Sequence, residues 1–508
     1  MVDVEADGHG QLQRSDTSSP QGSAISSQPV TRSNRGFYSY AYRFFDSIGL
    51  VTVYNAPIDA KLILAQRYVR VFAYGLVALI RAAYLAALGI SETQIGIFFG
   101  LTLVGDLFVV MLLTQLADTI GLKKILILGA VSMTASGLVF ALSGNYWVLL
   151  TAAIVGVVSP SATEVGPFKT IEESALFTLM SPNKVVDILS WYNTAEFASV
   201  AVGLLVGASI LEFLQRNDWN FVAACRVVFF CYAAVGILKI VLSSCLSSRI
   251  EPWHHLNNHR QAARDESDQT YPISTEQEPL LASSTAEASR PGSPEFRQGY
   301  SIFSLDREER LVLLKLCILM PLDAAAVGLQ SVPWQTYFVR TRFHVSSSRL
   351  GTTFFFSSCL GALGTILSIG LARKMGNMMT LAVTSYLTGI TLMFFGFPST
   401  INVLLIVILL EAFLEPIYIA PRNALIGALL TPTKRTASLG LISIVKMISN
   451  GSGSALTGIL ADRSLFWLAF AIAGLLKIGY ATGMLWTFFA IDRKTTAEQK
   501  LQVEEGCQ

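Results

Sequence analysis

Twelve apolar stretches dominate the sequence, and each is long enough to cross a lipid bilayer. A helix needs roughly 20 apolar residues to span the hydrocarbon core of a membrane. The stretches form two sets of six, so the sequence predicts an all-α membrane protein with twelve transmembrane helices. The first set covers about residues 67–88, 95–116, 124–142, 146–163, 187–211 and 221–243, and the second about 311–338, 347–371, 379–397, 401–418, 436–459 and 466–489.

The two sets share a repeated pattern. A run that begins at Gly96 and leads into a charged hinge at Gly121 is matched, without a gap, by a run that begins at Gly351 and reaches Gly376. Internal symmetry of this kind is typical of secondary transporters. The repeat therefore predicts two pseudo-symmetric six-helix bundles.

Composition agrees with a membrane location and excludes several kinds of partner. Charged residues make up 14% of the chain, whereas a soluble globular protein carries about 25%. The formal net charge of +2 is too small to favour nucleic acid. Five of the six cysteines lie in or beside apolar stretches, with no CxxC spacing, which predicts core residues rather than metal ligands. We expect no metal and no cofactor.

Polar segments lie outside the predicted bundles. Residues 1–36 are rich in Ser, Gln and Gly and are expected to be disordered; the aromatic run 37–45 is expected either to lie on the bilayer or to pack as a loop under the bundle. No cleavable secretory signal is visible, so the first spanning helix is expected to direct insertion. The predicted parts are a disordered or interfacial segment at 1–58, a bundle at 59–243, a linker at 244–310, a second bundle at 311–490 and a tail at 491–508.

Basic residues in the loops predict the orientation of the chain. They concentrate in the loops on one side, in the linker and in the tail, which places both termini and the linker in the cytoplasm; Arg340 and Arg342 run against this trend. Within the linker, Glu276 to Leu281 fits an acidic dileucine signal that a sorting adaptor would read. The membrane is expected to be a vacuole-like membrane or the plasma membrane.

The loop after the second predicted helix resembles the hinge motif of the major facilitator superfamily. The residues that fit the family pattern G-x-L-x-D-R-x-G-R-R are Leu116, Asp118, Gly121, Lys123 and Lys124. In the second half, Arg373 stands where the acid would be. The resemblance implies that the hinge acts as a latch when the cytoplasmic side is closed. The alternative is a plain loop whose lysines only fix the orientation.

Two proline-containing stretches mark the same side of the membrane. Glu164-Val165-Gly166-Pro167 ends one predicted helix, and with Trp191-Tyr192-Asn193 it looks like a microbial and fungal subgroup of unassigned substrate. Pro421-Arg422 is its counterpart in the second half. Such prolines predict either a simple helix stop or a gating role for Glu164 and Arg422. The cytoplasmic gate candidates are Asp118, Gly121, Lys123, Lys124, Glu164, Arg373, Arg422 and Arg435.

Ionisable residues inside the apolar stretches are candidates for the substrate site. Such a residue costs about 2.5–3.5 kcal/mol on insertion scales, so it usually faces the bundle interior. Several stand about half-way along their helices, where transporters bind substrate. The candidates for substrate or proton binding are Arg81, Asp106, Glu196, Asp323, Gln330, Trp334, Glu411 and Lys446. Lys477, in the last helix, is expected to be a peripheral charge.

Alternatives stay open for these residues. Any one of them could form a structural salt bridge, and Asp106 is expected to be either a proton site or an interhelical partner of Arg81. Gln330 and Trp334 can hydrogen-bond or stack on an organic solute. Asp106 and Asp323 are the first candidates for carrying coupling protons.

The sequence therefore predicts a secondary transporter that moves a small organic solute by alternating access, with protons as the candidate coupling ion. The alternatives are an exporter of amphipathic compounds, an uptake carrier for a polar or anionic solute, and a non-transporting sensor that keeps a transporter fold. No phosphate-binding Gly-rich loop is present, and no Ser/His/Asp set lies at a plausible site, so we expect no enzyme. A monomer embedded in lipid is expected.

Overall fold

The computed structural model describes residues 50–156, 167–180, 182–247, 250, 307–398, 400–430 and 435–505. Residues 52–508 belong to one compact unit; of the other unit, residues 1–51, the structure describes Leu50 and Val51. Gate candidate Glu164, the signal from Glu276 to Leu281 and nearly all of the predicted linker and N-terminal segment lie outside the described residues.

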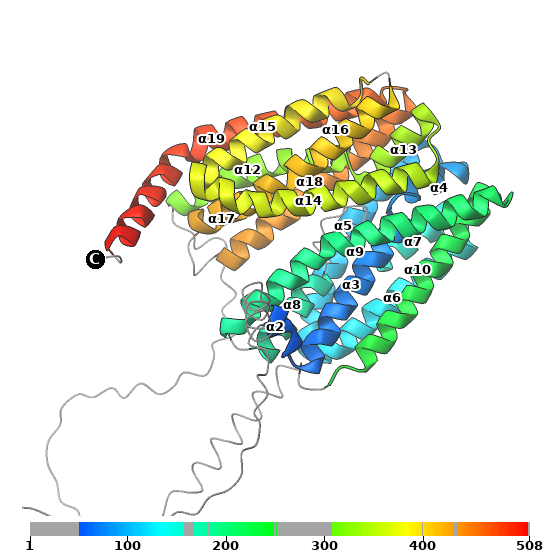
Figure 1. Ribbon diagram of the computed structural model, residues 1–508, viewed down its shortest axis with the longest axis horizontal. Helices are drawn as coiled ribbons and strands as arrows, with labels where there is room; N and C mark the ends of the chain where they lie inside the picture. Colours follow the sequence, from blue (N-terminus) through cyan, green and yellow to red (C-terminus); the bar gives the residue numbers. More distant parts are fainter. Residues whose placement is uncertain are drawn as a thin grey trace, which may run out of the picture. The chain divides into compact units, whose positions relative to one another are not determined.

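The first half of the chain supplies one bundle of helices, drawn in blue to green in Figure 1. The short helix α2 (Leu50–Tyr54) precedes it. The bundle consists of α3 (Ile58–Ala78), α4 (Arg81–Ala87), α5 (Glu92–Ile120), α6 (Leu122–Leu142), α7 (Tyr146–Val155), α8 (Pro167–Leu179), α9 (Pro182–Arg216) and α10 (Phe221–Ser244). Helices α3 and α4 form one crossing that bends by 43°.

The second half supplies a matching bundle, drawn in light green to red. It consists of α12 (Arg307–Leu329), α13 (Val332–Phe343), α14 (Ser347–Met375), α15 (Asn377–Phe395), α16 (Ile401–Leu414), the 3-10 helix η3 (Glu415–Tyr418), α17 (Ile419–Leu429), α18 (Arg435–Asp462) and α19 (Phe466–Glu505). The first crossing is interrupted in both halves, as α3–α4 in one and as α12–α13 in the other, and in the second half the fourth crossing is interrupted as well, as α16–η3–α17.

The repeated hinge has the same backbone conformation in both halves. Gly121 precedes α6 with φ 107° and ψ 146°, and Gly376 precedes α15 with φ 85° and ψ 160°. A positive φ of this size is readily available to glycine alone. The duplication seen in the sequence is thus present in the fold.

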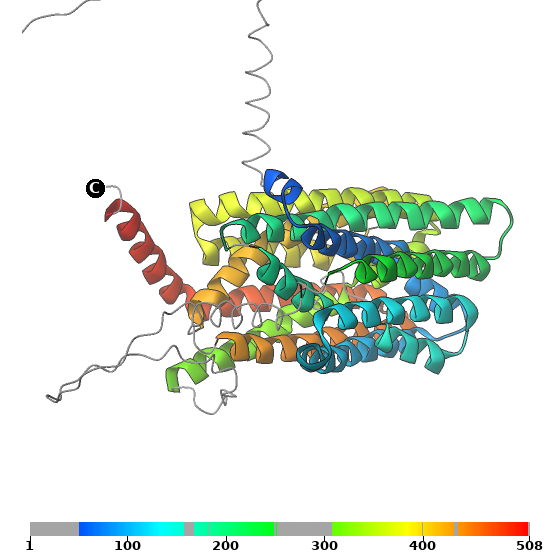
Figure 2. The same ribbon diagram turned by 90° about the horizontal axis from the view of Figure 1, so that it is seen from below.

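Two helix pairs join the halves. Helix α9 packs on α14, and α5 packs on α18; Figure 2 shows these pairs on opposite sides of the unit. The α5–α18 contact is close because glycines face each other, and a Cβ on Gly96 would lie 2.8 Å from the Cα of Gly458. Small residues of this kind let helix backbones approach in membranes.

The outer surface of the unit is apolar. Among the described residues, nine helices are long and apolar enough to cross a membrane, or ten if α3 and α4 count as one crossing. Exposed side chains include Phe108, Ile366 and Ile406. In water such a surface would aggregate, so it is the face that meets lipid. Together with the shorter apolar helix α7 and with α18, these helices confirm the predicted all-α membrane fold with six crossings in each half.

Two predicted helix boundaries were wrong. The first crossing begins at Ile58 rather than at residue 67, so Arg67 and Arg70 lie inside it. The fourth crossing of the second half does not stop at residue 418 but continues through α17 to Leu429. Pro421 lies in the first turn of α17, where a helix needs no backbone N–H, so this proline does not end the helix.

Candidate functional site

The second half contains a buried acid surrounded by three polar partners. Asp323 of α12 is 1% exposed. Arg422 Nη1 donates to its Oδ2 at 2.7 Å, and the Tyr418 hydroxyl donates to its Oδ1 at 3.0 Å. The Nζ of Lys477, on α19, lies 4.0 Å from Oδ1. This acid therefore ties together the first, fourth and sixth crossings of its half.

The first half contains a cluster of the same composition. Glu172 of α8 is fully buried. Arg70 Nη2 donates to its Oε2 at 2.8 Å, and the Tyr192 hydroxyl donates to the same oxygen at 2.6 Å. The Nζ of Lys239, on α10, lies 3.9 Å from Oε1. Again the first, fourth and sixth crossings meet at one carboxylate.

The two clusters differ in which crossing carries the acid and which carries the arginine. In the first half the arginine comes from the first crossing and the acid from the fourth, whereas in the second half Asp323 comes from the first crossing and Arg422 from the fourth. The lysine comes from the sixth crossing in both. Each half thus joins its first and fourth crossings by a buried pair of an acid and an arginine, which we call its joint, and the two residue types are exchanged between the halves. Breaking a buried pair typically costs about 3–5 kcal/mol, so each joint holds its own half together.

A further ion pair lies beside the first cluster. Arg67 of α3 donates to Glu196 Oε2 on α9 at 2.6 Å, and the Arg67 guanidinium lies 5.0 Å from the centre of the Tyr192 ring. Arg67 is fully buried, while the Glu196 side chain keeps 19% of its surface exposed. Glu196, a predicted substrate candidate, is therefore held by an arginine in this conformation.

The second cluster extends along the interrupted fourth crossing. Glu415, the first residue of η3, accepts from Lys477 Nζ at 3.1 Å and from Gln330 Nε2 at 3.4 Å. One turn earlier along the chain lies Glu411, whose side chain is 4% exposed. Pro416 lies inside η3; because it lacks a backbone N–H, it favours the break in the helix at this level.

Lys446 reaches the same cluster from α18. Its charge interacts with those of Asp323 and Arg422, and its side chain is partly buried. Within the described part of the chain, no acceptor lies in hydrogen-bond or ion-pair contact with its ammonium group. The predicted candidates Asp323, Gln330, Glu411 and Lys446 are therefore brought together, and the gate candidate Arg422 joins them.

Arg81 and Asp106 form a separate group in the first half. Both side chains are 2% exposed, and their charges interact. The Arg81 guanidinium also lies 5.2 Å from the centre of the Tyr74 ring. The two residues, which one of the alternatives for Asp106 makes interhelical partners, are thus neighbours, but they lie in the half that does not contain Asp323.

Contacts between the halves gather at one end of the unit, where α5 begins and α18 ends; we call this the sealed end. Thr93 Oγ1 donates to Asp462 Oδ2 at 2.8 Å. The Tyr337 hydroxyl donates to Glu92 Oε1, also at 2.8 Å. The backbone N–H of Ser348 donates to Glu212 Oε2 at 2.9 Å. Each of these bonds joins a residue of one half to a residue of the other.

Trp334 belongs to the sealed end. Its indole N–H donates to Ser454 Oγ at 3.0 Å, and its ring meets those of Phe99 and Phe466 edge to face. The side chain is fully buried. In this conformation Trp334 therefore contacts side chains of both halves rather than an open cavity.

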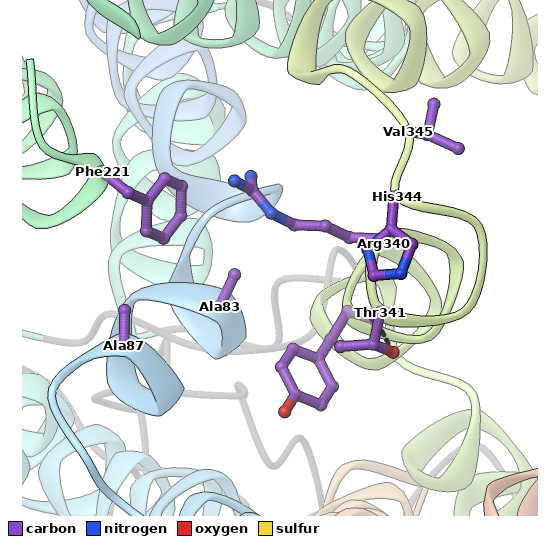
Figure 3. A pocket seen from close by; sticks show the side chains of 8 residues that line it. Ala83, Ala87, Phe221, Arg340, Thr341, His344 and Val345 are labelled. Carbon is purple, nitrogen blue, oxygen red and sulfur yellow. Dashed lines mark hydrogen bonds between the residues drawn. The ribbon is translucent and has the colours of Figure 1, made fainter. Parts of the chain in front are cut away.

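A cavity of about 470 Å³ lies at the sealed end, between α4, α10 and α13. Figure 3 shows Arg340 extended across it toward Phe221, with Thr341 and His344 on the opposite wall. The Arg340 guanidinium lies 4.0 Å from the centre of the Phe221 ring. This contact again joins the two halves, so the cavity lies beside the seal and not beside the acidic clusters.

The remaining gate candidates lie at the opposite end, where α10 ends and α12 begins; we call this the linker end. Lys123 Nζ donates to the backbone carbonyl of Leu246 at 2.5 Å, whereas Lys124 and Arg373 are exposed. The side chains of Asp118 and Arg435 lie outside the described residues. The latch predicted for this end stays a prediction.

Sequence reasoning missed part of the site. Lys477 was expected at the periphery, and this was wrong: it is fully buried and bonded to Glu415. Arg67, Arg70 and Lys239 were not candidates, because the first two stood at a predicted helix end and the third near the end of α10. Charge complementarity between crossings is the signal that could have found them. Among the described residues, no cluster of His, Cys, Asp and Glu could hold a metal ion.

Comparisons with known proteins agree with this fold. A family model described as Major Facilitator Superfamily matches residues 68–401 and 316–506. The chain is 30% identical over 442 residues to "Uncharacterized membrane protein YJR124C" of Saccharomyces cerevisiae, covering 86% of this chain and 96% of the yeast protein.

Two solved structures illustrate the likeness in fold. The inward-open conformation of the xylose transporter XylE from E. coli gives a TM-score of 0.62 at 13% identity, covering 85% of this chain and 96% of that one. An inward-facing bacterial homolog of the human lysosomal transporter Spinster gives 0.59 at 14% identity, covering 84% and 94%.

Proposed function

Since this chain belongs to the major facilitator superfamily, an integral membrane transporter family, we propose that it carries a small organic solute across the membrane by alternating access. The two halves rock about the α5–α18 and α9–α14 contacts. The solutes of the structural neighbours do not carry over to this chain, because at 13–14% identity the likeness concerns the fold.

The observation that carries the proposal is the cluster around Asp323. It combines three bases and three acids on four crossings in the interior of an apolar bundle: Asp323, Glu411, Glu415, Arg422, Lys446 and Lys477. Buried charges in a membrane are costly and mark substrate or ion pathways. The interrupted fourth crossing supports the same assignment, because transporters often build their sites at broken helices.

Contacts between the two halves lie at the sealed end, and this supports a conformation that is open at the linker end. Hydrogen bonds and aromatic contacts between the halves, such as Thr93–Asp462 and Trp334–Phe99, lie at the sealed end. The exposed basic residues Lys124, Arg373 and Lys374 lie at the linker end, which supports a cytoplasmic position for that end by the positive-inside rule. The conformation is then open to the cytoplasm.

Transport by purified protein tests the proposal. The full chain is reconstituted into vesicles, a metabolite panel of sugars, polyols, amino acids, amines and carboxylates is supplied, and uptake is measured by mass spectrometry with and without a pH gradient. We expect at least one solute to accumulate and Asp323→Asn to abolish its accumulation. If the folded protein moves no solute of any class, it is not a transporter, and a sensor with a transporter fold becomes the better hypothesis.

A further inference from the structure

The cavity at the sealed end has no part in the site proposed above. Its volume of about 470 Å³ falls within the range of small-molecule sites, which is about 300–1,000 Å³. The first half contributes α4 and the start of α10 to its walls, and the second half contributes α13 and the two residues that follow it. A ligand in this cavity would therefore touch both halves at once.

Arg340 crosses the cavity without an acidic partner. It extends from the last turn of α13 toward α10, where its guanidinium lies 4.0 Å from the centre of the Phe221 ring (Figure 3). Its side chain makes one long hydrogen bond to a described residue, from Nη1 to Ser347 Oγ at 3.4 Å. No carboxylate of the described residues lies within ion-pair distance of it. Because a guanidinium has five N–H donors, donors remain for a ligand.

The polar groups around the cavity favour a negatively charged ligand. His344 lies on the wall opposite Phe221 (Figure 3), and its imidazole has no hydrogen-bond partner in the part of the chain that the structure describes. None of the described residues that line the cavity is an acid. Two carboxylates nearby are bonded elsewhere, since Glu92 accepts from Tyr337, and Glu212 accepts from the N–H of Ser348. The lining thus carries a positive charge without a counter-charge.

The rest of the lining is apolar and favours an organic ligand. Ala83 and Ala87 of α4 form one wall with the ring of Phe221, and Val345 adds to the other. A small inorganic anion could pair with Arg340 but would leave these surfaces without contact. A neutral apolar compound would cover the walls but leave the guanidinium without a counter-charge. The combination fits one acidic group on a compact apolar body.

The cavity requires that the halves be closed at this end. Ala83 and Phe221 belong to the first half, and Arg340 and His344 belong to the second. In the proposed transport cycle the sealed end opens, so these walls separate and the cavity is lost. A ligand that binds one of two conformations shifts the equilibrium toward the conformation that it binds.

We propose that this cavity is a regulatory site, in which a small organic anion binds Arg340 and the apolar walls of α4 and α10 and holds the sealed end closed. Binding depends on the cavity alone, whereas its effect on the cycle, slower transport, rests on the proposed function. The site also gives a role to Arg340, which runs against the distribution of basic residues that orients the chain.

Binding to the purified full chain in lipid nanodiscs tests the site, with empty nanodiscs as the blank. The probe is 2-naphthalenesulfonate, which is permanently charged. Its neutral match is 2-naphthalenesulfonamide, and sulfate is the anion without an apolar body. Isothermal titration calorimetry measures each dissociation constant. We expect the naphthalenesulfonate to bind about tenfold or more tightly than either, because it alone uses both the guanidinium and the apolar walls.

Two variants change the cavity in different ways. Arg340→Gln removes the guanidinium and should weaken binding of the naphthalenesulfonate about tenfold or more. Ala87→Phe keeps Arg340 but fills space at an exposed edge of the cavity, and it should block binding as well. Arg349→Gln, which changes an exposed arginine of α14 bonded to Asn402, is the matched control and should leave binding unchanged. Size-exclusion profiles show that each variant is folded.

A locked protein tests the link between binding and the seal. Thr93→Cys with Asp462→Cys places two thiols where the native side chains lie 2.8 Å apart across the halves. After cross-linking, the sealed end cannot open. The locked protein should bind the naphthalenesulfonate at least as tightly as the reduced protein, because none of it is in the conformation that lacks the cavity. Loss of binding on cross-linking would overturn the inference.

The outcomes separate this inference from the proposed function. In vesicles, the naphthalenesulfonate should slow uptake of any solute that the protein moves, and Arg340→Gln should abolish this inhibition. Equal binding of the charged and neutral probes, or unchanged binding in both cavity variants, overturns the site. Transport of the probe itself, or binding without inhibition, overturns the regulatory role while transport stands. If no solute moves at all, the proposed function fails, and binding to the locked protein still decides whether the site exists.

Discussion

A single carboxylate organises each half of the molecule. Asp323 and Glu172 each accept from an arginine and a tyrosine and lie about 4 Å from a lysine. Burying such a group is costly unless its partners remain in place. Replacing it should therefore affect folding as well as transport, and the two effects can be separated.

Asp323→Asn should destabilise the protein by about 3–5 kcal/mol, because it keeps the shape but leaves Arg422 without its counter-charge. The double variant with Arg422→Gln should recover part of this loss. Thermal unfolding in detergent measures both. Arg216→Gln, which removes an exposed pair with Glu212, is the control and should cost about 0.5 kcal/mol or less. An equal effect of Asp323→Asn and the control would contradict the role given to the buried acid.

The opposite polarity of the two clusters allows a charge-exchange experiment. Arg70→Glu or Glu172→Arg alone should prevent accumulation of folded protein, because each puts like charges together in a buried site. The double variant restores one pair of opposite charges but leaves Lys239 beside the new arginine, so it should recover only part of the folded yield. Size-exclusion profiles from membranes measure this. A double variant no better than either single change would argue against an equivalent joint.

At the scale of helices, the sequence predicted the number and repetition of the crossings but not their interruptions. Runs of about 20 apolar residues are unambiguous, and Gly121 and Gly376 marked the same hinge twice. The continuation through Pro421 was missed because a proline is harmful inside a helix but neutral in its first turn. Sequence alone does not tell which of these positions Pro421 occupies.

The α5–α18 contact depends on having no side chain at its glycines. A Cβ on Gly458 would lie 2.4 Å from the backbone oxygen of Glu92, so Gly458→Ala must push the helices apart and should weaken the sealed end. We expect lower transport and a melting temperature several degrees lower. Gly440→Ala, on the same helix but with open space around it, should not lower the melting temperature. A Gly458→Ala protein with normal activity would show that the close approach is not needed.

The two hinge glycines should be equally intolerant of substitution. Gly121→Ala and Gly376→Ala place a Cβ on backbones with φ 107° and 85°, which costs roughly 1–2 kcal/mol at each site. Thermal unfolding should show similar losses for the two. Gly370→Ala, in the last turns of α14 with no neighbour within 4 Å, should be neutral or slightly stabilising. A loss of stability at only one of the two glycines would mean that the two hinges do not contribute equally to the stability of the fold.

At the scale of the whole molecule, the sequence showed which charged residues lie in the middle of the membrane but not which of them contact one another. Asp323, Glu411 and Lys446 stood out because charged residues are rare in apolar stretches. Their partners lie about a hundred residues away along the chain, as Asp323 and Arg422 do, and pairing at that distance depends on helix rotation and depth. Lys477 was misplaced for the same reason, since nothing local indicates which face of α19 is buried.

Alternating access predicts that joining the halves at the sealed end will stop transport. Thr93 and Asp462 touch across the halves at 2.8 Å, so Thr93→Cys with Asp462→Cys should cross-link under oxidation or with a short bis-thiol reagent. Transport should fall to background and return on reduction. Either cysteine alone, treated in the same way, should remain active. Full activity of the cross-linked protein would show that the seal does not open during the cycle.

The exchanged acid and arginine have one more consequence. A fold that arose by copying would at first have had two identical inner joints, yet these two have opposite signs. Neither half can now replace the other, because a hybrid with two first halves would lack Asp323, Glu415 and Lys477, which meet in the second half. Each half nevertheless contains a buried ion pair of its own. A change to the polar residues around Asp323 therefore leaves the Arg70–Glu172 pair of the first half in place.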